Sequence, residues 1–177
     1  MKEFEIKCLV SMSTFYDLIQ KIKTKYPNST SKTKLQINYY YDTENYDLHK
    51  QGMTCRIRLS EDKIIGQYKE HYLDGSHCSK ETDFQVNELP QTIMKEEQRL
   101  IFLGELVTTR MSFLITPYVK IECDVNFYLG NCDHEIEIEY EDGYYDFAKQ
   151  IADSLMLTEI NNFSKYDRFL KAKKCFV

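Results

Sequence analysis

Short segments in which ionised and apolar side chains alternate contain most of the residues that could carry out chemistry. The segment EFEIK places Glu3, Glu5 and Lys7 between apolar residues. Successive side chains of a β-strand point to opposite faces, so each such segment predicts a strand with one charged and one apolar face. The same alternation occurs in CRIRL, VKIECDV and HEIEIEY. The charged positions of these three segments are Arg56, Arg58, Lys120, Glu122, Asp124, Glu135, Glu137 and Glu139.

The charged faces allow two interpretations. The polar side of an antiparallel sheet usually faces water, and this is the commoner arrangement for a single strand. Here, however, carboxylates gather on some strands and basic residues on others, and glutamates in a row repel one another unless cations offset their charge. If the sheet closes with these faces inward, the buried charges need partners in one another, in a metal ion or in an anionic ligand.

Binding of a polyphosphate would use both kinds of face together. Guanidinium and ammonium groups donate charge-assisted hydrogen bonds to phosphoryl oxygens. Carboxylates hold hard divalent cations such as Mg²⁺ or Mn²⁺, which bridge to the same phosphates and offset the charge that develops during phosphoryl transfer. The pattern therefore favours a site for a polyphosphate with its metal ions.

Alternation and helical periodicity also predict the elements that would position these residues. Eight antiparallel strands, with helices between and after them, predict an α+β fold whose sheet is either open or closed on itself as a barrel. The strands are expected at 2–10, 34–42, 54–60, 63–71, 80–87, 105–114, 117–126 and 133–141, and the helices at 13–25, 92–103, 144–157 and 163–173.

Composition and charge narrow the class of protein. With 177 residues and no linker or internal repeat, residues 1–177 are expected to form a single domain. The net charge of -5 argues against binding of nucleic acid over a basic surface. The six cysteines form no CxxC pair and are expected to be reduced thiols of a cytoplasmic protein. No segment predicts a signal peptide or a membrane span, so no membrane partner is expected.

Several motifs in order along the chain resemble those of one family. EFEIK matches the ExExK signature of the CYTH domain, or triphosphate tunnel metalloenzyme, family, which includes thiamine triphosphatases, inorganic triphosphatases and class IV adenylate cyclases. It is followed by YYYDT, CRIRL, QYKE, TTR, IECD, EIEIE and SKYDRFL, so the resemblance spans nearly the whole chain. The motif context is most similar to the small single-domain bacterial type.

The resemblance implies an eight-stranded antiparallel β-barrel, or tunnel, with helices packed outside and a charged lining that binds a triphosphate and a divalent metal. It implies metal ligation by Glu3, Glu5, Glu122, Asp124, Glu135 and Glu137, with Glu122 and Asp124 exchanging roles according to how IECD is aligned. It implies phosphate binding by Lys7, Arg56, Arg58, Lys69, Arg110, Lys165 and Arg168. The catalytic residues expected among these are Glu5, Glu137 and Lys165.

Some charged and titratable residues are expected outside this site. Glu139 shares the face of Glu135 and Glu137 but is expected at the rim of the tunnel. The histidines show no metal-ligand spacing and are expected at the surface or in turns. They are His49, His71, His77 and His134.

The favoured function is metal-dependent hydrolysis of a small-molecule triphosphate, with Mg²⁺ or Mn²⁺ as cofactor. Inorganic triphosphate is the simplest substrate, and an organic triphosphate such as thiamine triphosphate is an alternative. A class IV-type adenylate cyclase remains a second enzymatic interpretation. A module that binds polyphosphate or nucleotide without turnover is a third. The protein is expected to be a monomer or a homodimer.

Overall fold

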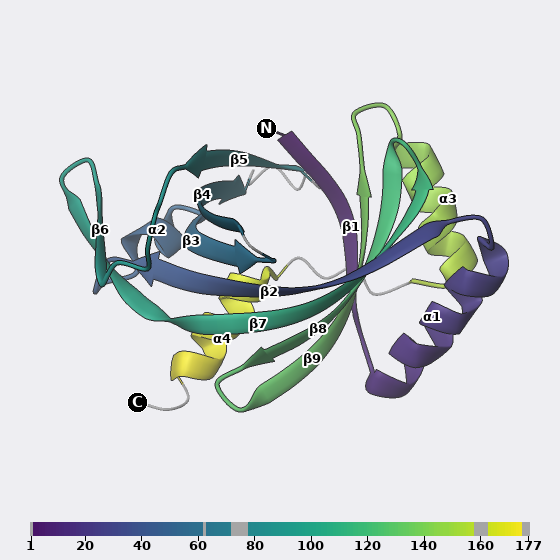
Figure 1. Cartoon of the computed structure of the whole chain (residues 1–177), viewed down its shortest axis with the longest axis horizontal. Coiled ribbons are helices and arrows are strands. Elements are labelled where there is room, and N and C mark those ends of the chain that lie inside the picture. Colours follow the sequence, from purple (N-terminus) through teal and green to yellow (C-terminus); the bar gives the residue numbers. More distant parts are fainter. Residues whose placement is uncertain (1, 62, 72–77, 158–162, 175–177) are drawn as a thin grey trace.

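Eight antiparallel strands close into a barrel in the computed structural model (Figure 1), which describes residues 2–61, 63–71, 78–157 and 163–174. The strand order is β2-β3-β4-β5-β1-β9-β8-β7, and pairing of β2 with β7 closes the ring. The predicted α+β fold with an eight-stranded antiparallel barrel is therefore confirmed. The barrel strands are β1 (Lys2–Val10), β2 (Thr30–Asp42), β3 (Met53–Ser60), β4 (Lys63–His71), β5 (Cys78–Phe84), β7 (Gln98–Thr116), β8 (Val119–Tyr128) and β9 (Asn131–Tyr140).

The register of the strands directs the charged faces inward. Glu5 lies opposite Glu139, and Lys7 lies opposite Glu137, which is also opposite Glu122. A slip of one residue would exchange every charge with an apolar group, so the apolar faces specify this register.

The apolar faces of β1, β8 and β9 are covered from outside by α1 (Met12–Lys25) and α3 (Tyr145–Leu155) (Figure 1). Each fully buried aliphatic side chain of this layer contributes about 1.5–3 kcal/mol. The side chains that form it include Phe15, Ile19, Ile22, Ile121, Ile136, Ile138 and Ile151.

The other two helices lie at the opposite part of the barrel. The short α2 (Asp47–Lys50) follows β2, and α4 (Lys165–Lys174) ends the described chain. Tyr166 and Phe169 of α4 pack against Tyr40 and Leu106, whose side chains share the inner face of the barrel. Whereas α1 and α3 cover the outside, α4 therefore reaches the interior. No helix within the described ranges is both long and apolar enough to cross a lipid bilayer.

The helix predicted at 92–103 is wrong. This segment forms β6 (Thr92–Lys95) and the start of β7, which pair as a hairpin with Ile93 opposite Leu100. Both of these side chains pack into an apolar cluster with Tyr41 and Ile57. Glu96 adopts the left-handed conformation (φ 54°) at the turn. Glu96 and Glu97 form the turn of this hairpin.

Gly104 lies where β7 passes closest to α4. Its φ of +144° strains any residue that has a Cβ, and a Cβ built there would lie 2.7 Å from Cζ of Phe169. We expect Gly104→Ala to lower the free energy of unfolding by about 2–4 kcal/mol in urea titrations, because backbone strain and overpacking add. Gly130→Ala is the control, since Gly130 also has a positive φ (+71°) but a Cβ at that position would meet nothing within 4 Å. Equal losses for both variants would contradict the close approach of α4.

Candidate functional site

A polar cavity lies inside the barrel. Its wall combines residues from β1, β2, β3, β4, β7 and β9 with the first residues of α4. Segments that are distant in sequence therefore contribute to one enclosed surface. The lining residues are Glu3, Glu5, Lys7, Tyr40, Thr54, Arg56, Arg58, Lys69, His71, Arg110, Glu137, Glu139, Ser164, Lys165 and Tyr166.

Neighbouring strands β3 and β4 supply a basic wall to this cavity. Arg56 donates from Nη2 to Oε1 of Glu81 (2.9 Å), and Lys69 pairs with Glu3 and, at 3.7 Å, with Glu5. These two cations are thus neutralised by carboxylates of the neighbouring strands β5 and β1. On the β1 side, Lys7 donates to Oε1 of Glu5 at 2.7 Å.

Arg58 differs from the other cations of the basic wall. Its Nε donates to Oδ1 of Asn38 (2.9 Å), and among the described residues it forms no ion pair within 4.0 Å. Burial, together with the charges of Arg56 and Arg110, lowers the pKa of Arg58 to about 10. A guanidinium held among like charges without a carboxylate partner is suited to receive an anion.

Strands β8 and β9 supply an acidic wall, and Arg110 of β7 crosses it. Arg110 donates to both carboxylate oxygens of Asp124 (2.8 and 2.6 Å) and to Oε2 of Glu137 (2.5 Å), and it also pairs with Glu122. Burial by itself would lower the pKa of Arg110, but Asp124 and Glu137 outweigh it and raise that pKa well above its usual value. Arg110 therefore orders the carboxylates of this wall.

The first residue of α4 brings a second cation to the acidic wall. Nζ of Lys165 lies 2.5 Å from Glu135, 2.7 Å from Glu137 and 2.9 Å from Asp124. Burial opposes the charge of Lys165, yet the attraction of Glu135 and Glu137 raises its pKa well above the usual value. Lys165 is thus a fully charged ammonium at the junction of the helix and the tunnel.

The carboxyl groups of the cavity differ in proton affinity. Burial would raise the pKa of Glu5, but Lys69 and Lys7 lower it to about 2. Burial raises the pKa of Glu135 to about 7 against the attraction of Lys165. Burial also raises the pKa of Glu139 to about 7, and the charge of Glu122 adds to the increase. A divalent cation bound beside the last two groups would compete with their protons near neutral pH.

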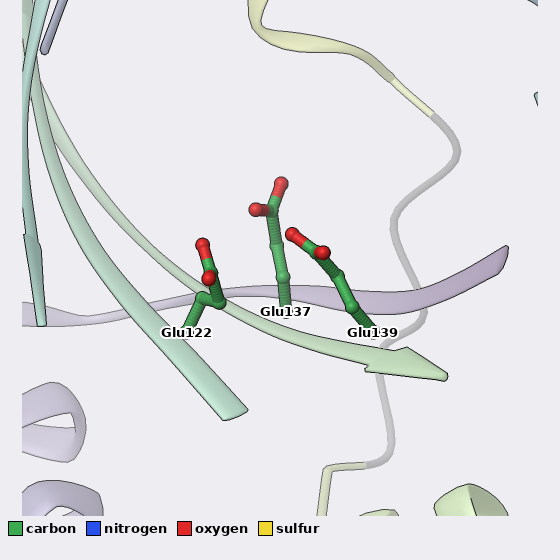
Figure 2. A group of neighbouring side chains, drawn as sticks. All are labelled: Glu122, Glu137 and Glu139. Atoms are coloured by element: carbon green, nitrogen blue, oxygen red, sulfur yellow. The ribbon is translucent and has the colours of Figure 1, made fainter. Parts of the chain in front are cut away.

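Two groups of three carboxylates fit a hard divalent cation. Oxygens of Glu122, Glu137 and Glu139 lie within 4.8 Å of one another, and so do oxygens of Asp124, Glu135 and Glu137. Figure 2 shows the first group, in which Glu137 stands between Glu122 and Glu139 and all three carboxylates point to the same side of the strands.

The hydrogen bonding of these carboxylates agrees with such a fit. Among the described residues, Oε2 of Glu122 and Oε2 of Glu135 are buried and accept no hydrogen bond, although a guanidinium lies beside each. Both oxygens are ion-paired with these guanidinium groups, and carboxylate oxygens are among the ligands that Mg²⁺ and Mn²⁺ prefer.

The structure brings together most residues that the sequence suggested for the site. Nine of them line the cavity: Glu3, Glu5, Lys7, Arg56, Arg58, Lys69, Arg110, Glu137 and Lys165. Glu122, Asp124 and Glu135 are buried in the adjoining acidic wall. Arg168 lies farther along α4, where it pairs with Asp133 (2.8 Å) and Glu135 (2.6 Å), and it is absent from the cavity lining.

Other residues lie differently from the expectation. Glu139 lines the cavity and pairs with Lys120 (2.6 Å), so it belongs to the wall and not only to the rim. His71 also lines the cavity, where burial and Lys69 lower its pKa to about 4. His134 is buried against Phe15. The alternation of strand faces could have predicted that His71 and Glu139 point inward, because each follows an inward-facing residue (Lys69 and Glu137) at a spacing of two. His77 lies outside the described residues.

Solved structures share this fold. The chain is similar to a Bacillus halodurans protein provisionally assigned as an adenylate cyclase, with a TM-score of 0.72. The two sequences are 24% identical over 95% of this chain and 98% of that one. HpAC1 from Hippeastrum, which has a dominant triphosphatase activity, gives a TM-score of 0.71 at 20% identity over 96% and 95% of the two chains. The mimivirus capping enzyme triphosphatase gives 0.61 at 12% identity over 89% and 90%.

Sequence comparison identifies the family. No curated protein matches the chain. The sequence model of the CYTH domain, however, matches residues 1–170. This range includes every strand of the barrel and the first residues of α4. The chain therefore belongs to the CYTH domain family.

Proposed function

We propose that the chain is a divalent-metal-dependent triphosphatase that hydrolyses inorganic triphosphate or an organic triphosphate such as thiamine triphosphate. The observation that carries the proposal is that Arg58, which has no carboxylate partner among the described residues, lies in a cavity whose wall also holds buried carboxylates spaced for a cation. Membership of the CYTH family and the triphosphatase activity named for two structures of the same fold support this class of reaction.

The basic wall would hold the phosphates. Arg58 is available to donate two hydrogen bonds to phosphoryl oxygens, and Arg56 and Lys69 would exchange part of their contact with carboxylates for contact with the ligand. Lys7 of β1 lines the same cavity. A chain of phosphates held from several sides has its terminal phosphoryl group fixed for in-line attack.

The acidic wall would hold the metal and orient the attacking water. The proposed ligands are drawn from this wall (Glu122, Asp124, Glu135 and Glu137) and from Glu3 and Glu5 of β1. A bound Mg²⁺ or Mn²⁺ would supply positive charge that offsets the negative charge of the transferred phosphoryl group. Glu137 belongs to both carboxylate groups and contacts Lys165, so we assign it the central role in orienting water. Lys165 would stabilise negative charge on the phosphoryl oxygens.

An assay of phosphate release tests the proposal. Purified protein is incubated with inorganic triphosphate, thiamine triphosphate and ATP, each with Mg²⁺, with Mn²⁺ and with EDTA. We expect orthophosphate release from at least one substrate, dependent on metal and lost in the Glu3→Ala, Glu5→Ala double variant. Release equal to that of the double variant for every substrate and metal would contradict the proposal.

Product analysis separates this reaction from the alternatives. Cyclic AMP and pyrophosphate formed from ATP would identify a cyclase, because that reaction transfers the nucleotide instead of the terminal phosphoryl group. Calorimetric binding of triphosphate without turnover over several hours would identify a binding module. Orthophosphate and a diphosphate are the products of the proposed triphosphatase.

A further inference from the structure

Asp42 is a buried carboxylate that the proposed phosphate and metal sites do not use. It lies at the end of β2, fully buried, and its Oδ1 accepts from the backbone N–H groups of Thr43 (2.7 Å) and Leu48 (2.9 Å). Oδ2 accepts from the backbone N–H of His49 (3.0 Å). Three backbone donors therefore fix this carboxylate to the barrel and to the first turn of α2.

A fourth hydrogen bond joins Asp42 to α4. The hydroxyl of Tyr166 donates to Oδ2 of Asp42 at 2.9 Å, and the Tyr166 ring lies against Tyr40 with 4.8 Å between ring centroids. Burial and the Asp42 charge raise the pKa of Tyr166, so its hydroxyl keeps the proton that it donates. The contact links residues 124 positions apart in sequence.

Tyr166 directly follows Lys165 in the first turn of α4. Ser164 and Asp167 cap this turn through reciprocal hydrogen bonds (2.7 and 3.1 Å), but a cap fixes the turn only relative to its own helix. The first turn of a helix is also where helices fray. The bond from Tyr166 to Asp42 fixes this turn relative to the barrel.

We propose that Asp42, acting through the Tyr166 hydroxyl, is a positioning residue that holds the Lys165 ammonium in the tunnel for contact with the phosphates. This inference rests on the proposed function. Without the bond, α4 remains packed through Phe169 and Leu170, but the turn that carries Lys165 gains freedom. Ordering that turn when the ligand binds would then cost affinity.

Calorimetric titration with inorganic triphosphate in EDTA tests the inference without turnover. Tyr166→Phe removes one hydroxyl and leaves Asp42 its three backbone donors. We expect its affinity to fall by about tenfold. Tyr41→Phe is the matched control, because the Tyr41 hydroxyl donates to the carbonyl of Pro90 (2.8 Å) from a side chain that is equally buried. Its affinity should equal that of the wild type at a similar loss of stability.

A double-mutant cycle shows whether the effect passes through Lys165. In the Lys165→Ala background, Tyr166→Phe should change the affinity by less than about twofold, because the group that it positions is gone. An undiminished effect in that background, or equal affinities of Tyr166→Phe and the wild type, would overturn the positioning role. No binding of triphosphate by the wild-type protein in EDTA would also overturn the positioning role, whereas the proposed function fails only if no phosphate is released when metal is present.

Discussion

Glu137→Gln is expected to reduce the rate of triphosphate hydrolysis by about 10³-fold or more, since it removes a charge from the only carboxylate common to both cation-binding groups of the described residues. Oε2 of Glu137 accepts from Arg110 (2.5 Å) and Oε1 accepts from Lys165 (2.7 Å). Glutamine keeps the size and one acceptor but cannot ligate a cation as strongly. Steady-state phosphate release at saturating metal measures the effect.

The same substitution leaves two buried cations less compensated, so a folding defect must be separated from a catalytic one. Circular dichroism and a thermal melt of Glu137→Gln provide that separation. Glu105→Gln, on the exposed side of β7, is the control for loss of one glutamate from the sheet and should retain full activity. A folded Glu137→Gln protein that keeps more than about a tenth of the wild-type rate would contradict the role of Glu137.

The charged tunnel was predictable because its signal is local. A strand fixes the alternation of faces, so Glu3, Glu5 and Lys7 had to share one side whatever the rest of the chain did. The motif order then indicated closure, which turns that side inward. Charge alternation thus indicated the strands and their charged faces, whereas the family resemblance indicated the closed barrel and the roles of the site residues.

The features that the sequence did not predict depend on contacts between distant segments, which local patterns indicate only weakly. An amphipathic helix can cover either side of a barrel, so nothing local indicated that α4 would pack against Tyr40 and Leu106 inside it. The turn at Glu96 lacks the glycine or asparagine that usually marks a left-handed residue, and the hairpin was therefore predicted as a helix. The bond between Asp42 and Tyr166 depends on where α4 docks, which no local pattern encodes.

The depth at which a side chain lies in the tunnel also depends on contacts between distant segments. His71 and Glu139 lie on inward faces, but whether such a position is at the rim or in the cavity depends on how neighbouring strands are staggered. Stagger is set by pairing across the closed ring, between β2 and β7 as well as between sequential strands.

Arg58→Gln is expected to weaken binding of inorganic triphosphate by about 100-fold, because it removes two charge-assisted hydrogen bonds to the ligand. The same change should stabilise the ligand-free protein. Arg58 is held among Arg56 and Arg110 without an ion pair in the described part of the chain, and burial together with this repulsion lowers its pKa. A glutamine amide can still donate to Asn38, whose carbonyl now accepts from Arg58.

The stabilisation has a defined pH range. A basic group whose pKa is lower in the folded than in the unfolded state destabilises the fold while it is charged in both. With a folded-state pKa of about 10, this cost is fully present at neutral pH and fades only as the pH rises past that value. Relief of about 1 kcal/mol would raise the melting temperature of a chain of this length by about 2–4 °C at pH 7.5.

Calorimetry and thermal melts of the same preparation measure both effects. Arg99→Gln, which removes an exposed arginine from β7 away from the cavity lining, should change neither the affinity nor the melting temperature. Weaker binding together with a lower melting temperature would mean that Arg58 is a structural cation. Weaker binding together with a higher melting temperature would mean that the fold keeps an unfavourable charge at this position because the phosphates need it.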